Sequence, residues 1–243
     1  LTGMNQHTGN WPGKTVDIAQ GYCSSSKNSF VFVDIPGTYS ITANSPEEEV
    51  ARNFLCFSKP DAAVIVCDAT VLERNLNLVL QIREFMPRCV LCLNLMDEAK
   101  RKKIRIDTER LSKRLNMPVI ETVARNKKGL KELLETLDDI INKTGECYKI
   151  TYPKEIEEKI SLIEPLIKNK TNSINSRWLA LRILEGDSAL INTLKEHIND
   201  EIITEEITSL LSSYNTDKLR DIISGKIISE AEKICRYSTK ADD

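Results

Sequence analysis

The stretch Phe30–Gly37 constrains the fold of this chain more than any other. It opens with an apolar run of aromatic and β-branched residues, Phe30–Val33, which is typical of a buried strand. Asp34 ends the run, and Pro36 and Gly37 follow. A strand with this ending places a carboxylate and a flexible backbone at the edge of a sheet, where open α/β sheets bind ligands. The Asp-x-x-Gly pattern is common by chance, so its meaning depends on the rest of the chain.

Strand-like and helix-like segments alternate through the first half of the chain. The expected strands are 16–23, 29–34, 62–67, 88–93 and 118–122, and the expected helices are 46–57, 72–85, 107–115 and 128–142. Ser45 and Pro46 are typical of a helix start, because Ser is a favoured N-cap and Pro a favoured first residue. This alternation predicts an α/β domain built on a doubly wound, mostly parallel sheet.

The second half of the chain has a different pattern. Amphipathic helical segments are expected at 154–168, 174–185, 187–197, 200–213 and 215–236. Between the two halves, Gly145 and Pro153 interrupt the helical pattern. We therefore expect one domain over residues 1–146, a linker over 147–153 and an all-α domain over 154–243.

Composition excludes several classes of function. A net charge of −2 and an aromatic content of 5% give no sign of a nucleic-acid-binding surface. No apolar run approaches the roughly 20 residues that span a bilayer. Cys89 and Cys92 form a Cys-x-x-Cys, but in a strand residues three apart point to opposite faces, which disfavours a metal or redox pair. His7 and His197 are not expected to be ligands, and no cluster in the sequence has the spacing of an iron site.

Two other strand ends carry polar groups suited to a purine base. Asn94 and Asp97 follow the strand at 88–93, with Leu95 and Met96 between them. A carboxylate here can accept hydrogen bonds from N1 and N2 of guanine, which adenine cannot offer, while the Asn amide braces the loop. Taken alone, the same residues also fit a loop Asn and a helix-starting Asp. After the strand at 118–122, the backbone N–H of Ala124 is placed to approach O6 of the same base.

One apparent phosphate-binding motif is not supported. Gly13, Lys14 and Thr15 match the end of G-x-x-x-x-G-K-[ST], but the first glycine falls on Thr8. A phosphate loop also follows a strand and opens a helix, whereas here a strand-like segment follows the loop. We therefore expect residues 5–16 to form a polar loop of another kind.

In their order, Asp34-x-x-Gly37, Asn94-x-x-Asp97 and Ala124 resemble the G3, G4 and G5 motifs of a small GTPase domain. Four further segments resemble the FeoB-type ferrous iron transporters: Gly9–Val16, Ser45–Glu48, Asp68–Leu76 and Arg177–Asp187. This resemblance implies a small-GTPase-like α/β domain followed by an all-α helical spacer, in the cytosolic part of a membrane transporter.

The resemblance also assigns site residues for GTP or GDP. It implies that Thr15 reaches Mg²⁺, that Asp34 lies beside the Mg²⁺ site, and that the Gly37 amide meets the γ-phosphate, so Thr15 and Gly37 are the expected catalytic residues. It implies that backbone carbonyls of Gly9 and Trp11 help to hold K⁺. The residues expected at the nucleotide are Gly13, Lys14, Thr15, Val16, Asp17, Asp34, Ile35, Pro36, Gly37, Asn94, Leu95, Met96, Asp97, Val123, Ala124 and Arg125.

The chain departs from the family pattern in three places. Thr38 stands where Ras-like enzymes have a water-orienting glutamine, so slow hydrolysis that depends more on a cation is expected. Val123 replaces the family's G5 serine. Leu1–Met4 resembles the tail of a helix, and no strand with a phosphate loop precedes it. That loop supplies most of the amides around the phosphates. We therefore expect residues 1–243 to be a fragment that by itself does not bind GTP tightly and does not hydrolyse it. The missing strand is expected between 29–34 and 62–67.

The resemblance implies a guanine nucleotide and the transmembrane iron-permeation domain of the same full-length protein as partners. It places the chain at the cytoplasmic face of the bacterial inner membrane, and it leaves a homo-oligomer open. Two alternatives stay open at this point. One is a soluble GTPase of the ribosome- or tRNA-associated kind, which the charge balance disfavours. The other is a non-catalytic regulatory module that has lost nucleotide binding.

Overall fold

The computed structural model describes residues 2, 6–10, 17–38, 40–41, 45–168, 174–197 and 201–240. Two three-stranded sheets form within these residues. One is antiparallel, in the order β1-β2-β3, and comprises β1 (Gln6–Asn10), β2 (Asp17–Ser24) and β3 (Ser29–Asp34). The other is parallel, in the order β4-β5-β7, and comprises β4 (Ala63–Asp68), β5 (Cys89–Asn94) and β7 (Val119–Glu121).

Strand β1 corrects the expectation of a polar loop at its position. Residues Gln6–Asn10 pair with β2, from Gln6 opposite Gly21 to Asn10 opposite Asp17. The segment has no apolar alternation, so only tertiary pairing with β2 makes it a strand. Within the described residues, no ladder joins β3 to β4. The position where the sequence predicts a further strand thus coincides with the division between the two sheets.

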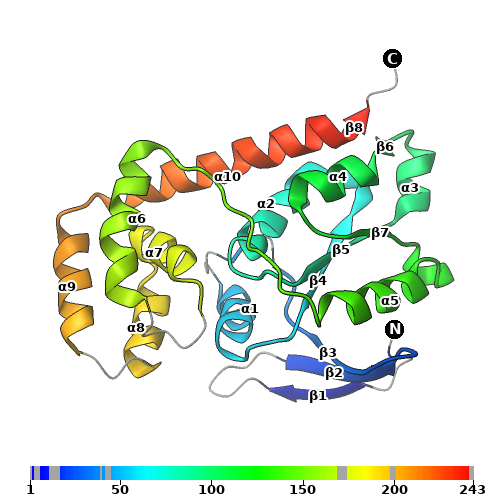
Figure 1. Cartoon of the computed structure of the whole chain (residues 1–243), viewed down its shortest axis with the longest axis horizontal. Helices are drawn as coiled ribbons and strands as arrows, with labels where there is room; N and C mark the ends of the chain where they lie inside the picture. The colour runs from blue at the N-terminus through cyan, green and yellow to red at the C-terminus, as the bar shows by residue number, and fades with distance from the viewer. Residues whose placement is uncertain are drawn as a thin grey trace.

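Helices cover the parallel sheet, as the alternation predicts (Figure 1). The helices of this half are α1 (Pro46–Phe57), α2 (Leu72–Arg83), α3 (Met96–Arg101), α4 (Thr108–Leu115) and α5 (Leu130–Ile140). Helices α2, α4 and α5 pack against strands of the parallel sheet. At the start of α1, the hydroxyl of Ser45 accepts a hydrogen bond from the Glu48 N–H at 3.2 Å, which confirms the expected N-cap. Helix α3 was missed, because a six-residue helix right after a strand leaves too short a periodic pattern.

The two faces of the parallel sheet bury different clusters. Leu91 and Leu93 of β5 belong to the main core, while Val90 and Cys92 belong to a second cluster that packs against α5. Phe30 and Phe32 of β3 pack against this second cluster. Side chains therefore alternate between faces along β5, as a strand buried on both sides requires.

The second half of the chain is helical, with α6 (Lys154–Ile167), α7 (Ser176–Leu184), α8 (Ser188–His197), α9 (Glu201–Ser212) and α10 (Thr216–Ser238). Residues Trp178–Leu184 of α7 are all buried, which confirms that this helix is central. Helices α6 to α9 gather at one end of the molecule, and α10 runs back across the α/β half (Figure 1). There α10 packs against α2 and α4. The short strand β8 (Thr239–Lys240), directly after α10, pairs antiparallel with β6 (Arg105–Ile106).

A buried arginine binds several loops of the α/β half. Arg83, at the end of α2, is 1% exposed and donates to four backbone carbonyls, those of Met86, Pro87, Asn116 and Glu146, at 2.8–3.1 Å. One guanidinium therefore supplies hydrogen bonds to carbonyls of several loops. This arrangement fixes where the linker after α5 passes the sheet.

Candidate functional site: a base-recognition corner

Three parallel strands deliver polar groups to one edge of their sheet. Asp68 ends β4, Asn94 ends β5 directly opposite it in the register, and Thr122 follows β7. The carboxylate of Asp68 accepts a hydrogen bond from the Thr70 N–H at 2.7 Å and so caps the turn Ala69–Val71. The Asp68 carboxylate therefore binds within its own turn. Asn94 and Thr122 are the polar residues at this edge that connect neighbouring loops.

The side-chain oxygen of Asn94 binds the loop that follows β7. It accepts hydrogen bonds from the Ala124 N–H at 3.0 Å and from the Thr122 hydroxyl at 3.1 Å. The Thr122 N–H in turn donates to the Leu93 carbonyl at 2.8 Å. Two loops about 30 residues apart in the chain are thus joined into one corner. The prediction that Asn94 braces the loop is consistent with these contacts.

The Thr122 hydroxyl is the member of this corner that the sequence did not reveal. Thr122 is fully buried and also lies 3.3 Å from the Cys92 thiol. A buried threonine at a strand end is equally typical of ordinary packing, so no local signal separates the two roles. Its function follows only from the contact with Asn94.

Asp97 lies in the first turn of α3, beside the corner. Its Oδ2 accepts a hydrogen bond from the Arg125 guanidinium, and its Oδ1 is buried without a hydrogen-bond partner among the described residues. Leu95, just before α3, has φ of 62°, in the left-handed region that side chains other than glycine seldom adopt. Such backbone strain persists where the surrounding structure fixes it, which is common at ligand sites.

The loop after β7 turns sharply around Gly129. This residue has φ of 79°, and a Cβ built on it would lie 2.1 Å from the Glu121 carbonyl oxygen. Only glycine fits so close to the strand backbone in this conformation. Gly129 therefore allows the loop to pass close to the end of β7, next to the bridge between Val123 and Lys128 that closes the turn.

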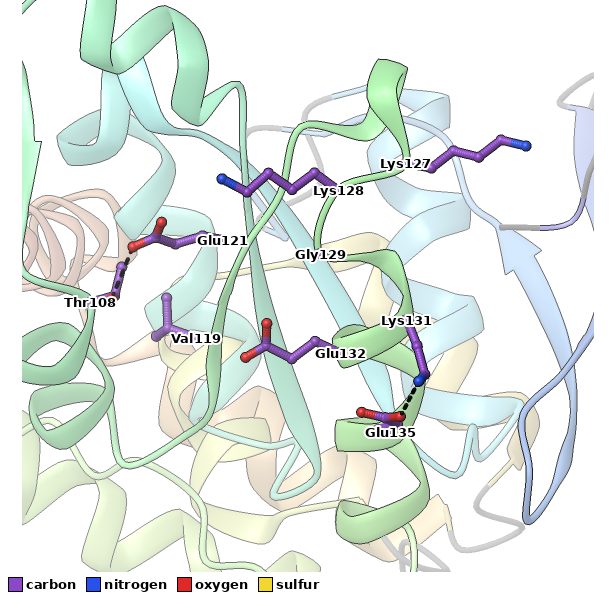
Figure 2. Close-up of a pocket in the computed structure, with 9 residues that line it drawn as sticks. All are labelled: Thr108, Val119, Glu121, Lys127, Lys128, Gly129, Lys131, Glu132 and Glu135. Carbon is purple, nitrogen blue, oxygen red and sulfur yellow. Dashed lines mark hydrogen bonds and ion pairs between the residues drawn. The ribbon is translucent and has the colours of Figure 1, made fainter.

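A separate hollow of about 550 Å³ lies behind this loop, between α4, β7 and α5 (Figure 2). Lys128 extends over it toward the side where Glu121 accepts a hydrogen bond from the Thr108 hydroxyl at 3.3 Å, and Lys127 points away (Figure 2). Its lining contains neither Asn94 nor Asp97. The hollow is thus distinct from the base-recognition corner.

The cysteines of the two central strands are buried thiols. Burial raises the pKa of Cys67 to about 12 and also raises the pKa of Cys92, which the contact with Thr122 partly offsets. Cys89 and Cys92 lie in the two different core clusters, on opposite faces of β5. The prediction that they form no pair is consistent with this placement, and among the described residues no three His, Cys, Asp or Glu side chains gather as a metal site.

Two family models match the chain. The model of ferrous iron transport protein B matches residues 1–137, and that of the FeoB cytosolic helical domain matches residues 152–240. The chain belongs to the FeoB family. The same result confirms the resemblance expected from the sequence, together with an α/β G domain followed by a helical domain.

Relatives agree with this assignment. The Fe(2+) transporter FeoB of Salmonella typhimurium is 34% identical over 191 residues, which cover 77% of this chain and 25% of that protein. A Porphyromonas gingivalis Fe(2+) transport protein A/FeoB fusion protein is 35% identical over 78% of this chain and 23% of its own length. The chain therefore spans about a quarter of the curated relatives that it matches.

Solved structures match over nearly the whole chain. The cytosolic domain of the T. maritima FeoB iron transporter in its GDP form I superposes with a TM-score of 0.86 and 29% identity, over 99% of this chain and 91% of that one. The cytosolic domain of L. pneumophila FeoB gives a TM-score of 0.84 and 28% identity, over 99% and 92%. No helix in the described part of this chain has the length and apolar character needed to cross a membrane.

Only some of the other FeoB-type site residues expected from the sequence fall within the described part of the chain. Trp11, Gly13, Lys14, Thr15 and Val16 lie outside the described residues. Gly9 is in β1 opposite Ile18, and Asp17 begins β2.

At the end of β3, Asp34 is exposed and pairs through its backbone with Ala19. Among the described residues, no hydrogen bond or ion pair joins Asp34, Ile35, Pro36 or Gly37 to the base-recognition corner. Hydrogen bonds do bring together Asn94 with Ala124 and Asp97 with Arg125, and the Met96 N–H donates to the Thr122 carbonyl at 3.3 Å. The segment after Gly37 is held elsewhere, because the Ile41 N–H donates to Gln81 of α2 at 2.8 Å.

Proposed function

We propose that this chain is the guanine-nucleotide-binding cytosolic part of a ferrous iron transporter, in which slow GTP hydrolysis regulates iron passage through a transmembrane domain of the same full-length protein. The observation that carries the proposal is the corner in which Asn94 holds the Ala124 loop beside the carboxylate of Asp97. A carboxylate at this position selects guanine over adenine by accepting its N1 and N2 hydrogens. The family and the GDP form of the T. maritima relative support this assignment.

The proposal includes Mg²⁺ at the phosphates. Asp34 suits it, because its carboxylate is exposed at a strand end and has no hydrogen bond or ion pair with another described residue. Mg²⁺ prefers oxygen ligands and keeps several of its waters, so the hydroxyl of Thr15 would bind the ion and Asp34, beside it, would accept hydrogen bonds from those waters. The ion neutralises phosphate charge. Gly37, three residues after Asp34, is exposed, and its N–H has no hydrogen-bond partner among the described residues, so it is available to a phosphate oxygen. A K⁺ ion at the carbonyls of Gly9 and Trp11 belongs to the same proposal.

The test is nucleotide binding by the full-length protein, since residues 1–243 contain no phosphate-loop sequence. Fluorescent GDP and ADP are titrated in Mg²⁺ with K⁺ or with Na⁺ as the monovalent cation, and GTP hydrolysis is followed under the same conditions. We expect binding of GDP but not ADP, and hydrolysis that is faster in K⁺. Equal affinity for the two nucleotides, or no binding of either, would show that this member is a regulatory module without guanine recognition.

The site of action is also part of the proposal. We expect the full-length protein at the cytoplasmic face of the bacterial inner membrane, with the transmembrane iron-permeation domain as its partner. Ferrous iron uptake by cells that carry Asp97→Asn is the corresponding measurement. Uptake equal to that of the natural protein would contradict a role of guanine binding in transport.

A further inference from the structure

Arg125 occupies the carboxylate that the proposed function assigns to guanine. Its Nη2 donates to Oδ2 of Asp97, and its Nη1 lies 4.0 Å from Oε1 of Glu98. The guanidinium is at the surface, since the Arg125 side chain is 58% exposed and that of Asp97 is 28% exposed. The contact is therefore reversible and screened by salt.

The second oxygen of the same carboxylate is free. Oδ1 of Asp97 is buried and has no hydrogen-bond partner among the described residues. A carboxylate with one oxygen bound and one oxygen without a protein partner is matched by a ligand with two parallel N–H donors. Such a ligand binds both oxygens only after Arg125 leaves Oδ2.

Guanine and arginine present the same donor pattern. The N1–H and N2–H groups of guanine lie on either side of one carbon, as two N–H groups of a guanidinium do. Arg125 is thus an internal mimic of the guanine edge, placed on the loop that also carries the Ala124 N–H. That N–H is itself bound to Asn94 at 3.0 Å, so the base-recognition corner is closed on itself.

We propose that Arg125 is an internal competitor of guanine at Asp97, so that the nucleotide-free corner is closed by Arg125 and nucleotide binding displaces it. This inference rests on the proposed function and adds to it a residue that weakens guanine nucleotide affinity and speeds release. Because an exposed ion pair changes an equilibrium constant by at most about fivefold, the effect is modest and tunable.

The main variant is Arg125→Gln in the full-length protein, which removes the charge and keeps most of the side-chain stem. We expect the Kd for GDP to fall by about twofold to fivefold relative to the natural protein at low salt. The ratio of the two Kd values approaches one at high salt, where the ion pair is screened. Lys127→Gln is the matched control, because Lys127 is an exposed cation of the same loop whose side chain points away from the hollow (Figure 2). Its Kd ratio is expected to stay at one.

A second measurement ties the effect to Asp97. Asp97→Asn converts the acceptor into an amide that can donate to the C2 carbonyl of xanthine, so this background is assayed with xanthosine diphosphate. There we expect Arg125→Gln to change the Kd by less than the experimental error, because the charge that Arg125 pairs with is gone.

The outcomes separate the two proposals. If GDP binds to the natural protein but Arg125→Gln binds it equally or more weakly, the competitor role is wrong and the proposed function stands. An equal effect of Arg125→Gln in the Asp97→Asn background also overturns it. If no variant binds a guanine or xanthine nucleotide, the proposed function fails and this inference fails with it.

Discussion

Arg52 of α1 donates from its Nη1 to the carboxylate of Asp187, which lies 135 residues later, between α7 and α8. The Arg52 side chain is completely buried, and the Asp187 side chain is 11% exposed. The other oxygen of Asp187 accepts a hydrogen bond from the Leu190 N–H at 2.9 Å. This ion pair thus joins the helix that follows the Asp34–Gly37 segment to the helical half of the chain. Any movement of α1 must be accommodated at this contact.

We expect Asp187→Asn to destabilise the chain strongly. The amide keeps the contact with the Leu190 N–H but removes the charge opposite Arg52, which leaves a buried guanidinium without its counter-ion. Removal of one partner of a buried ion pair costs about 3–5 kcal/mol in the free energy of unfolding. Urea unfolding followed by circular dichroism measures the change.

Two variants serve as controls for this prediction. In Arg52→Met/Asp187→Asn the buried charge is gone as well, so we expect part of the stability to return. Glu232→Gln neutralises an exposed partner of Arg236 in α10, and a loss of at most about 1 kcal/mol is expected there. If Asp187→Asn loses no more than Glu232→Gln, the ion pair does not hold the two halves together.

A buried carboxyl predicts how stability depends on pH. The Tyr152 hydroxyl donates to both oxygens of Glu84, at 3.0 Å, and Glu84 is 6% exposed. Burial raises the pKa of Glu84 to about 7, while Arg182, the Tyr152 hydrogen bond and Arg177 act in the opposite direction.

The sign of the effect follows from linkage. In the unfolded chain the Glu84 pKa is near 4.5, so the folded state holds its proton to higher pH. Its contribution to stability is complete below about pH 4.5 and is lost as the pH rises through about 7. We therefore expect the free energy of unfolding to fall over this window, and to fall less in Glu84→Gln, which cannot ionise. Urea unfolding at several pH values measures the difference between the two proteins. Parallel profiles would contradict the raised pKa.

The turn of the β2–β3 hairpin gives a third prediction. Oδ1 of Asp138 in α5 accepts hydrogen bonds from the Asn28 side chain at 2.7 Å and from the Ser25 hydroxyl at 2.8 Å. The contact with Asn28, together with that of Ser25 and the charge of Lys27, lowers the pKa of Asp138. We expect Asp138→Ala to release the turn and to speed tryptic cleavage after Lys27, measured by mass spectrometry over time. Asp139→Ala removes only the exposed ion pair with Lys27, at 3.3 Å, and cleavage close to that of the natural chain is expected. Equal rates in the two variants would rule out Asp138 as the anchor.

Local patterns predicted the helices and strands well where side chains alternate or recur. The expected helix at 46–57 has the bounds of α1, and the expected strand at 29–34 has those of β3. Strand β1 could not be predicted, because its polar residues are ordered by pairing with β2 and not by their own preference. Longer-range contacts decide such segments.

The candidate site shows the same division. The Asn94, Asp97 and Ala124 motif was visible because each follows a strand end. The hydrogen bonds of these residues could not be predicted, since the contact of Arg125 with Asp97 joins residues 28 apart in the chain. The sequence predicted that these residues lie at one edge of the sheet. Only the structure showed that they form hydrogen bonds with one another, from Ala124 to Asn94 and from Arg125 to Asp97. The expected assignments at Thr15 and Trp11 remain predictions.

The Thr122 hydroxyl gives the last prediction. It is buried between the Leu93 carbonyl and the side-chain oxygen of Asn94, to which it donates at 3.1 Å. Thr122→Val has nearly the same shape but cannot donate, so Asn94 retains only the Ala124 N–H. Both acceptors keep one partner, because the Leu93 carbonyl still binds the Thr122 N–H. Because one net hydrogen bond contributes about 0.5–1.5 kcal/mol, we expect a loss of that size in urea unfolding, and several-fold weaker GDP binding by the full-length protein under the proposed function. Thr122→Ser keeps the hydroxyl and is expected to preserve GDP binding while losing some packing. A Thr122→Val protein that binds GDP as tightly as Thr122→Ser would show that the hydroxyl does not position Asn94.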